Sequence, residues 1–310
     1  MDKRVLVITG PTATGKTALG IELAKRLGGE IVSADSMQLY RGMDIGTAKV
    51  SPSEMEGIPH HLIDVAEPDE DWSVARWVSA AAEIAEDIFA RGKLPIIVGG
   101  TNLYIDSLLS GRDFAESENA ALRESLNAEY DALGGEAFLE KLRAVDPDRA
   151  EKLHPADKKR LVRAMEVYTL TGQTITAHDA ETQKLPPRWD SLRVALTYAD
   201  RDDLYDRIDA RVDEMVRWGL FDEVIGLLSR GLSPDCTAMQ AIGYKEAARY
   251  LRGEMTGGEV VDEIKRSSRR YAKRQLTWLR RDEGLHWIEW DGTPDIATAA
   301  DKVCALWNKK

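Results

Sequence analysis

The sequence predicts an α/β protein in which helices flank a parallel sheet, with an α-helical insertion. Two observations lead to this class. Residues 5–9 form a short apolar run that meets a glycine-rich loop, and residues 18–27 then follow helical spacing, so the chain opens with a strand, a loop and a helix. Strand and helix patterns alternate further on, whereas residues 112–188 show helical patterns only.

The first half of the sheet is predicted from two more buried strands with a helix between them. Residues 31–32 and 94–98 are apolar and end at small residues, and residues 74–90 form an amphipathic helix. Because a helical crossover returns the chain in the same direction, we expect these strands to pair in parallel.

The insertion is predicted at 112–188, between two parts of the core domain, 1–111 and 189–310. Gly, Pro and Asp breaks separate its expected helices, and the pair Pro186-Pro187 closes it. The expected helices cover residues 120–133, 136–145, 148–153 and 158–170.

The core domain then resumes with a strand pattern at 192–198. We predict one long helix from Arg201 to near Gly231, a late helix at 259–281 and a last strand at 285–290. On the late helix Ile264, Tyr271 and Trp278 recur every seven residues, which indicates that one face is core.

Composition excludes several classes of protein. No run of about 18 apolar residues occurs and no leader pattern follows Met1, so we expect a cytoplasmic protein that binds no membrane. Cys236 and Cys304 stand alone and no histidine has metal-ligand spacing, which disfavours disulfide frameworks and zinc sites. The net charge of -11 argues against a protein that coats nucleic acid by charge alone.

Two clusters of basic residues oppose this net charge. Residues 265–281 hold eight basic side chains and no acidic one. Lys158, Lys159, Arg160 and Arg163 form the second cluster. Each cluster fits either a surface that follows phosphates or an ordinary solvated helix face, and the sequence alone leaves both open.

The strongest motif is Gly-Pro-Thr-Ala-Thr-Gly-Lys-Thr, which fits G-x-x-x-x-G-K-[ST] between a predicted strand and a predicted helix. The core is therefore predicted to be P-loop NTPase-like. In such a loop backbone N–H groups surround phosphate oxygens, the lysine adds a full charge and the last hydroxyl can hold Mg²⁺. The predicted phosphate-binding residues are Gly10, Pro11, Thr12, Ala13, Thr14, Gly15, Lys16 and Thr17.

Asp35 follows the second predicted strand, which we expect to lie next to the P-loop strand. Ligands bind at the carboxyl ends of such strands, so Asp35 fits a metal ligand, a base or a helix cap. The other sequence motifs of NTPases are poorly represented. The strand 94–98 ends in Gly-Gly-Thr and not in an acidic residue, and no Asn-Lys-x-Asp guanine-binding motif occurs.

At this point the chain resembles the bacterial tRNA dimethylallyltransferase family. After the P-loop comes Ser33-Ala-Asp-Ser-Met-Gln-Leu-Tyr-Arg-Gly-Met-Asp-Ile-Gly-Thr-Ala-Lys49, a block far more specific than the P-loop. Shorter matches span nearly the whole chain, at residues 98–101, 153–155, 160–168, 240–245 and 273–280. Asn102 departs from the family pattern, which often has Gly after Gly-Gly-Thr.

The resemblance implies transfer of a dimethylallyl group from dimethylallyl diphosphate to N6 of the adenine just 3′ of the tRNA anticodon, with Mg²⁺ as cofactor. The P-loop would bind the donor diphosphate, not ATP. Asp35 would take the N6 proton, and Lys16, Thr17 and Arg211 would stabilise the diphosphate. Arg207 and Arg211 lie four residues apart on a predicted helix, and a surface ion-pair ladder is their alternative role.

The expected partners are the tRNA anticodon stem-loop and dimethylallyl diphosphate, and we expect a monomer. The RNA-contacting residues that the resemblance implies mix charged with small and apolar side chains, which suits the extraction of one base from a loop. They are Asp35, Ser36, Met37, Gln38, Thr101, Arg123, Lys159, Arg160, Leu161, Val162, Arg163, Gln240, Ala241, Ile242, Gly243, Tyr244 and Lys245.

Three other functions stay open. A P-loop small-molecule kinase would hold ATP in the same loop, and an adenylate prenyltransferase would modify a free nucleotide. A nucleotide-switched RNA-binding protein would need base-reading elements that we do not find. The basic insertion favours tRNA over a free nucleotide.

Overall fold

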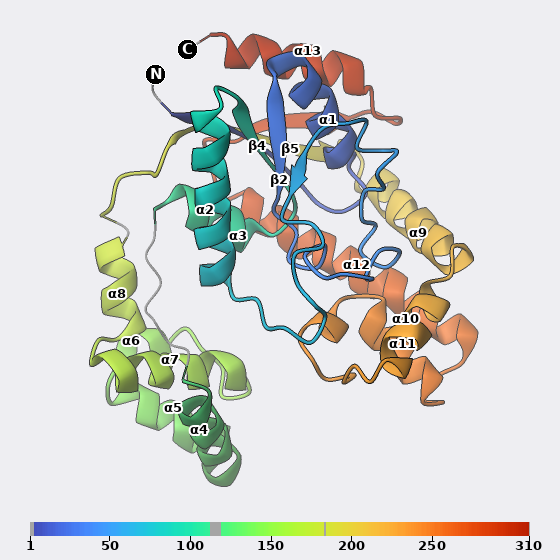
Figure 1. The fold of residues 1–310 in the computed structure, drawn as a ribbon. Coiled ribbons are helices and arrows are strands. Elements are labelled where there is room, and N and C mark those ends of the chain that lie inside the picture. Colours follow the sequence, from blue (N-terminus) through green and yellow to red (C-terminus); the bar gives the residue numbers. More distant parts are fainter. Residues whose placement is uncertain (1–2, 112–118, 183, 310) are drawn as a thin grey trace. The chain divides into compact units, whose positions relative to one another are not determined.

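The computed structural model describes residues 3–111, 119–182 and 184–309, which divide into two compact units (Figure 1). The core unit comprises Met1–Leu109 and Trp189–Lys310, and the insertion unit is Ser110–Arg188. The sequence-based prediction began the insertion at residue 112, and residues 112–118 lie outside the described residues.

A six-stranded sheet runs through the described part of the core unit in the order β3-β2-β4-β1-β5-β6, and every pairing is parallel, as predicted. One predicted neighbour is wrong, because β4 and not β2 pairs with the P-loop strand β1. Sequence order predicts parallel pairing but does not say which strand inserts between two others. The strands are β1 (Arg4–Thr9), β2 (Gly29–Ser33), β3 (His60–His61), β4 (Leu94–Val98), β5 (Asp190–Tyr198) and β6 (His286–Trp290).

Helices pack against the sheet through apolar stripes. Leu19 of α1 and Ala300 of α13 share a buried core with Leu6 of β1. Trp77 of α2 stacks on Tyr104 of α3 at 4.8 Å between ring centroids. The helices of the core unit are α1 (Lys16–Leu27), α2 (Val74–Ala90), α3 (Asn102–Leu109), α9 (Arg201–Arg217), α10 (Leu220–Ser229), α11 (Tyr244–Leu251), α12 (Gly257–Leu279) and α13 (Ile296–Trp307), with a 3₁₀ turn at Ala238–Gln240.

Two helix predictions are wrong. The single helix from Arg201 to near Gly231 is divided into α9 and α10, because Gly219 adopts φ 101°, a left-handed conformation that interrupts a helix and that glycine tolerates. On α12 the seven-residue spacing does not mark a continuous core face. Ile264 is buried, but Trp278 leaves 42% of its surface exposed.

The insertion unit has its own small core. Leu126, Phe138, Leu142 and Leu161 are buried together, as the helical spacing of this segment leads one to expect. Its helices are α4 (Ala120–Leu133), α5 (Gly135–Arg143), α6 (Pro147–Ala150), α7 (Lys158–Thr171) and α8 (Ile175–Thr182).

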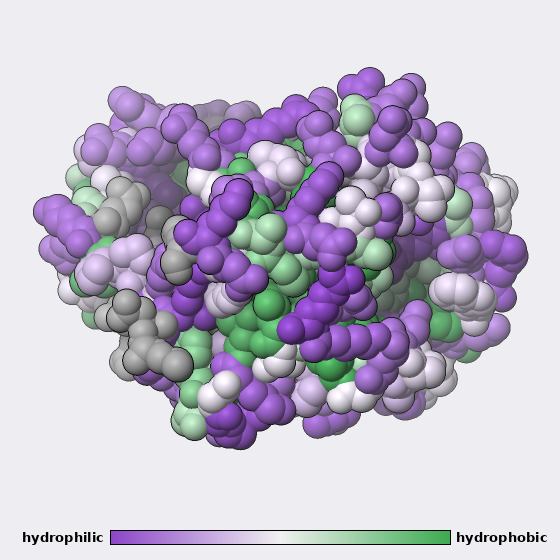
Figure 2. Space-filling view, turned by 90° about the horizontal axis from the view of Figure 1, so that it is seen from above, coloured by the Kyte–Doolittle hydropathy of each residue, from purple (hydrophilic) through white to green (hydrophobic). Residues whose placement is uncertain are grey.

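Hydrophilic residues predominate on the face drawn in Figure 2, with smaller apolar patches among them. Over the described ranges we find no helix with the length and apolar character that crossing a bilayer requires.

Two glycines offer a matched test of the packing behind β4. A Cβ at Gly99 would overlap the backbone carbonyl of Ala34, whereas one at Gly226, inside α10, would meet open space. We expect Gly99→Ala to destabilise the protein by about 1–3 kcal/mol through overpacking. Gly226→Ala should stabilise it by up to about 1 kcal/mol through helix propensity. Urea unfolding midpoints measure both, and a wild-type midpoint for Gly99→Ala would contradict this packing.

Candidate active site

The P-loop lies between β1 and α1, and its own contacts hold it in shape. Ala13 and Gly15 have positive φ values of 64° and 83°, a conformation that turns backbone N–H groups toward a common centre. The Thr14 hydroxyl donates to the Pro11 carbonyl at 2.8 Å. From β6, Trp290 Nε1 donates to the Thr14 carbonyl at 2.9 Å. The loop is therefore preformed as an anion cradle.

Gly10 fixes how closely the P-loop approaches the sheet. Its φ of 140° is open to glycine, and a Cβ would overlap the carbonyl oxygen of Leu196 on β5. No other residue type fits here without moving β5.

Lys16 and Arg211 bring positive charge to this cradle. Lys16 Nζ donates to the Pro11 carbonyl at 2.6 Å. Burial, together with the charge of Arg211 and against an opposing effect of Asp35, lowers the pKa of Lys16 to about 7. Burial likewise lowers the pKa of Arg211, against an opposing effect of Asp35. Two partly buried cations thus interact with the same carboxylate, an arrangement that an anionic ligand would stabilise.

Asp35 caps the turn that follows β2. Its Oδ1 accepts the backbone N–H groups of Met37 at 2.9 Å and Gln38 at 3.4 Å. Among the described residues no hydrogen bond reaches Oδ2, which leaves that oxygen able to accept a proton. The cap is therefore observed, and it is compatible with a further role as a base.

Thr101 joins this turn to the loop after β4. Its Oγ1 accepts the Ser36 N–H at 3.1 Å, and its N–H donates to the Ala34 carbonyl at 3.0 Å. Burial, aided by Asp35, raises the pKa of Tyr271 on α12 to about 12, and Thr101 opposes this shift. Sequence reasoning missed Tyr271 as a site residue, because its spacing marked it as core.

Asn102, the departure from the family pattern, links three elements. Its Oδ1 accepts from Thr9 Oγ1 at 3.2 Å, and its Nδ2 donates to the Gln275 carbonyl at 3.4 Å. Gln275 Nε2 donates in turn to the Gly100 carbonyl at 2.8 Å. The asparagine therefore begins α3 while tying the ends of β1 and β4 to α12.

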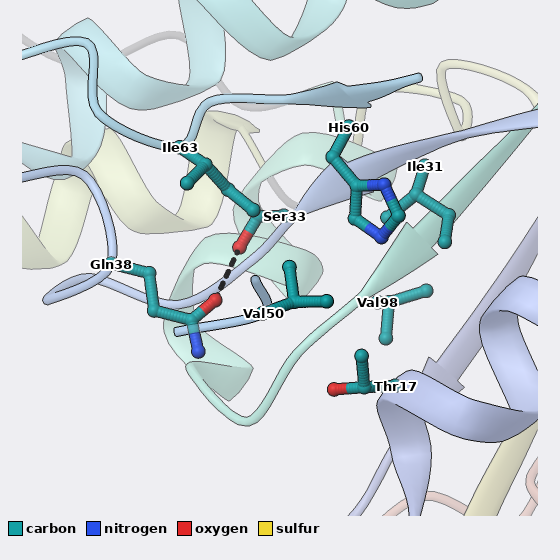
Figure 3. Close-up of a pocket in the computed structure, with 8 residues that line it drawn as sticks. All are labelled: Thr17, Ile31, Ser33, Gln38, Val50, His60, Ile63 and Val98. Carbon is teal, nitrogen blue, oxygen red and sulfur yellow. Dashed lines mark hydrogen bonds between the residues drawn. The ribbon is translucent and has the colours of Figure 1, made fainter. Parts of the chain in front are cut away.

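A small pocket opens beside Thr17 (Figure 3). Its lining is half polar and half apolar, and on the polar side Ser33 Oγ donates to Gln38 Oε1 at 3.4 Å. Gln38 Nε2 donates to the carbonyls of Thr47 and Ala48, at 3.2 and 3.3 Å. The lining residues are Thr17, Ile31, Ser33, Gln38, Val50, His60, Ile63 and Val98.

The segment 240–245 is joined to the loop after β2 by one carboxylate. Glu223 of α10 accepts the backbone N–H groups of Asp44 and Ile45, at 2.9 and 2.8 Å, and the Tyr244 hydroxyl. Tyr244 is fully buried and Ala241 nearly so, whereas Gln240 and Lys245 line a second pocket. Met37 also packs against the apolar cluster that holds Ala241 and Tyr244, so the structure brings the turn at residues 35–38 close to the segment 240–245.

The insertion unit holds its candidate residues around a buried carboxylate. Glu166 is fully buried and accepts from Arg123 Nε at 3.1 Å and from Arg163 Nη1 at 3.0 Å. Lys159 and Arg160 are exposed. Leu161 and Val162 are buried in the unit's core, so the side chains in this segment that face solvent are the basic ones.

The chain matches two family models, one described as IPP transferase over residues 38–282 and one as isopentenyl transferase over residues 3–67. It is 50% identical over 288 residues to a tRNA dimethylallyltransferase of Acetivibrio thermocellus, covering 93% of this chain and 92% of the relative. A relative of the same name from Geobacillus thermodenitrificans is 46% identical over 304 residues, covering 98% and 96%.

Solved structures agree with these matches. A tRNA isopentenylpyrophosphate transferase of Bacillus halodurans is 42% identical, with a TM-score of 0.72 over 98% of this chain and 96% of that one. A eukaryotic dimethylallyltransferase, in a structure described as acting on tRNA, is 30% identical, with a TM-score of 0.84 over 99% and 79%.

The lowered pKa of Lys16 predicts proton uptake on anion binding. A bound diphosphate raises the pKa of Lys16, so the lysine takes up close to one proton at pH 8 and little at pH 6. Calorimetry of inorganic diphosphate binding in buffers of different ionisation enthalpy measures this uptake. Lys16→Arg is the control, because arginine stays charged over this pH range. Equal proton uptake by both proteins would contradict the lowered pKa of Lys16.

Proposed function

Because this chain belongs to the IPP transferase family, we propose that it transfers a dimethylallyl group from dimethylallyl diphosphate to N6 of the adenine 3′ of the anticodon in tRNA. The observation that carries the proposal is the grouping of Lys16, Arg211 and Asp35. An anion-binding pair of cations beside a carboxylate fits a reaction with a diphosphate leaving group and a proton to remove.

The P-loop is proposed to hold the donor diphosphate. Its inward N–H groups and the start of α1 favour an anion, and Lys16 can leave the Pro11 carbonyl for a phosphate oxygen. Arg211 adds a second charge. These contacts strengthen as the C–O bond breaks and charge gathers on the diphosphate, so they stabilise the transition state more than the ground state.

A Mg²⁺ ion fits this site through oxygen ligands. Across the described residues no group of three or more His, Cys, Asp and Glu side chains could hold a metal, but Mg²⁺ prefers water and phosphate oxygens with few protein ligands. The exposed Thr17 hydroxyl at the pocket would hold it. When bound, the ion neutralises charge on the diphosphate.

Asp35 is proposed as the base for the incoming adenine. The N6 lone pair forms the new bond to C1 of the dimethylallyl group, the C1–O bond breaks, and the diphosphate leaves with the electron pair. The N6 proton passes to Oδ2 of Asp35, while Oδ1 stays bonded to Met37 and Gln38.

The tRNA itself is proposed to contact both units. The turn at residues 35–38 and the segment 240–245 supply the core unit's contacts, and Arg123, Lys159, Arg160 and Arg163 supply those of the insertion. Glu166 supports this role because it fixes two arginine side chains of the insertion unit. A monomer in the cytoplasm, where tRNA is found, belongs to the same proposal.

The direct test is incubation of the protein with Mg²⁺, dimethylallyl diphosphate and unmodified tRNA. We expect a mass gain of one dimethylallyl group on the adenine next to the anticodon, without ATP, by nuclease digestion and mass spectrometry. ATP hydrolysis without this gain would favour a small-molecule kinase, and prenylation of free AMP alone would favour an adenylate prenyltransferase.

Two substitutions separate the base from the cap at Asp35. Asn keeps an Oδ1 that can accept the Met37 and Gln38 N–H groups, whereas Ala removes both cap and base. We expect Asp35→Asn and Asp35→Ala each to slow transfer about 10²- to 10⁴-fold, the usual contribution of a general base, with donor binding retained. Activity restored by Asn alone would identify Asp35 as a cap.

A further inference from the structure

Lys49, near the end of the loop that follows β2, has an almost completely buried side chain. Only 5% of that side chain is exposed, and its Nζ donates to the Tyr40 carbonyl at 2.7 Å. The same nitrogen donates to Asp44 Oδ1 and to Asp64 Oδ1, each at 2.6 Å. An ammonium group has three donors, so every donor of Lys49 is used. The side chain therefore joins the loop after β2 to the segment after β3.

The backbone around Lys49 is strained. Ala48, Leu62 and Asp64 adopt left-handed φ values of 48°, 61° and 54°. Among the described residues, all non-glycine residues with such a backbone outside the P-loop lie within residues 48–64. This conformation costs free energy at a residue with a Cβ, and it persists where surrounding contacts enforce it. Lys49 supplies such a contact, because Ala48 precedes it in the chain and Asp64 accepts its ammonium.

Gln38 connects this strained part of the chain to Asp35. Its backbone N–H donates to Asp35 Oδ1 at 3.4 Å, and its backbone carbonyl accepts the Asp64 N–H at 3.2 Å. Its side-chain Nε2 donates to the carbonyl of Ala48 at 3.3 Å. One residue thus contacts the carboxylate of Asp35 and also both of the segments that Lys49 joins.

We propose that Lys49 is a positioning residue for the base: by holding the segments at Asp44 and Asp64 together it fixes Gln38 and, through Gln38, the carboxylate of Asp35. The proposal rests on the proposed function, in which Asp35 Oδ2 accepts the N6 proton. A general base must lie within hydrogen-bond reach of the proton that it removes. A misplacement of about 1 Å can slow a reaction about 100-fold, so a clamp of this kind acts on the rate.

Matched lysine variants test the clamp. Lys49→Met removes the three donors and keeps most of the length of the side chain. We expect kcat for tRNA modification to fall about 10- to 100-fold, with the KM for dimethylallyl diphosphate within about 2-fold of wild type, because the P-loop is unaltered. The control is Lys25→Met on α1, which removes a partly exposed ion pair with Glu56 and should leave both constants unchanged. An equal kcat for the two variants would overturn the proposal.

A double-mutant cycle separates positioning of the base from a general loss of structure. Asp35→Asn keeps the cap and removes the base, so a residue that acts only through the base has no remaining effect on the rate. Under single-turnover conditions, Lys49→Met should slow transfer in the wild-type background and not in the Asp35→Asn background. The same fold-loss in both backgrounds would show a merely structural role and contradict the proposal.

Variants of Asp64 test the same contact from its exposed side. Asn at this position keeps an oxygen that can accept from Lys49 and tolerates the left-handed backbone, whereas Ala loses the acceptor. We expect Asp64→Asn to retain most of the wild-type kcat and Asp64→Ala to lower it about 10-fold or more. Equal kcat values for these two variants would overturn the clamp. The Asp64 side chain is 47% exposed, so this comparison remains decisive if Lys49→Met does not fold.

The outcomes distinguish this proposal from the function on which it rests. Wild-type rates for Lys49→Met and Asp64→Ala, in a protein that modifies tRNA, would overturn the role of Lys49 alone. A wild-type rate for Asp35→Asn would remove the base and with it any residue that positions the base. A wild-type protein that does not modify tRNA would overturn the proposed function as well. Retained binding of inorganic diphosphate with Mg²⁺, measured by calorimetry, shows that each variant keeps its P-loop.

Discussion

The electrostatic interaction of Lys16 and Arg211 with Asp35 at the P-loop is the interaction on which the rest of the core unit depends. Lys16 and Arg211 are both desolvated and face one shared carboxylate, and burial lowers the pKa of each. Such a pair opposes folding unless the surrounding structure holds it in place. An anionic ligand offsets this free-energy penalty, so the same charges that destabilise the free protein give the site its affinity for that ligand.

The loops at the carboxyl ends of the central strands supply that rigidity. Gly10 lies against β5, and Gly99 lies against Ala34 so closely that neither accepts a side chain. Thr101 and Asn102 then tie the loops after β2 and β4 to each other and to α12. Ligands of open parallel sheets bind at this edge, and here hydrogen bonds between loops, more than the sheet itself, set the geometry of the carboxylate.

Two carboxylates that accept several hydrogen bonds hold side chains and loops in place in this acidic protein. Glu166 fixes Arg123 and Arg163 in the insertion unit, and Glu223 fixes the loop after β2 against Tyr244 in the core unit. Each carboxylate accepts hydrogen bonds from several donors and so orients side chains or backbone, and the buried Glu166 adds no exposed negative charge. A net charge of -11 is therefore compatible with local sites for RNA phosphates.

The sequence alone determined the features that depend on local pattern. Apolar runs and helical spacing predicted all the longer strands and most helices, and the P-loop follows from eight consecutive residues. Tertiary structure decided what depends on distant residues: β4 inserts beside β1, Gln275 of α12 donates to the Gly100 carbonyl, and Trp278 stays exposed although its spacing predicted core. Tertiary structure also decided the grouping of Lys16, Asp35 and Arg211. The number of residues between them in the sequence does not tell which side chains share a low-dielectric site. Periodicity records the face on which a residue lies, but only packing decides what covers that face.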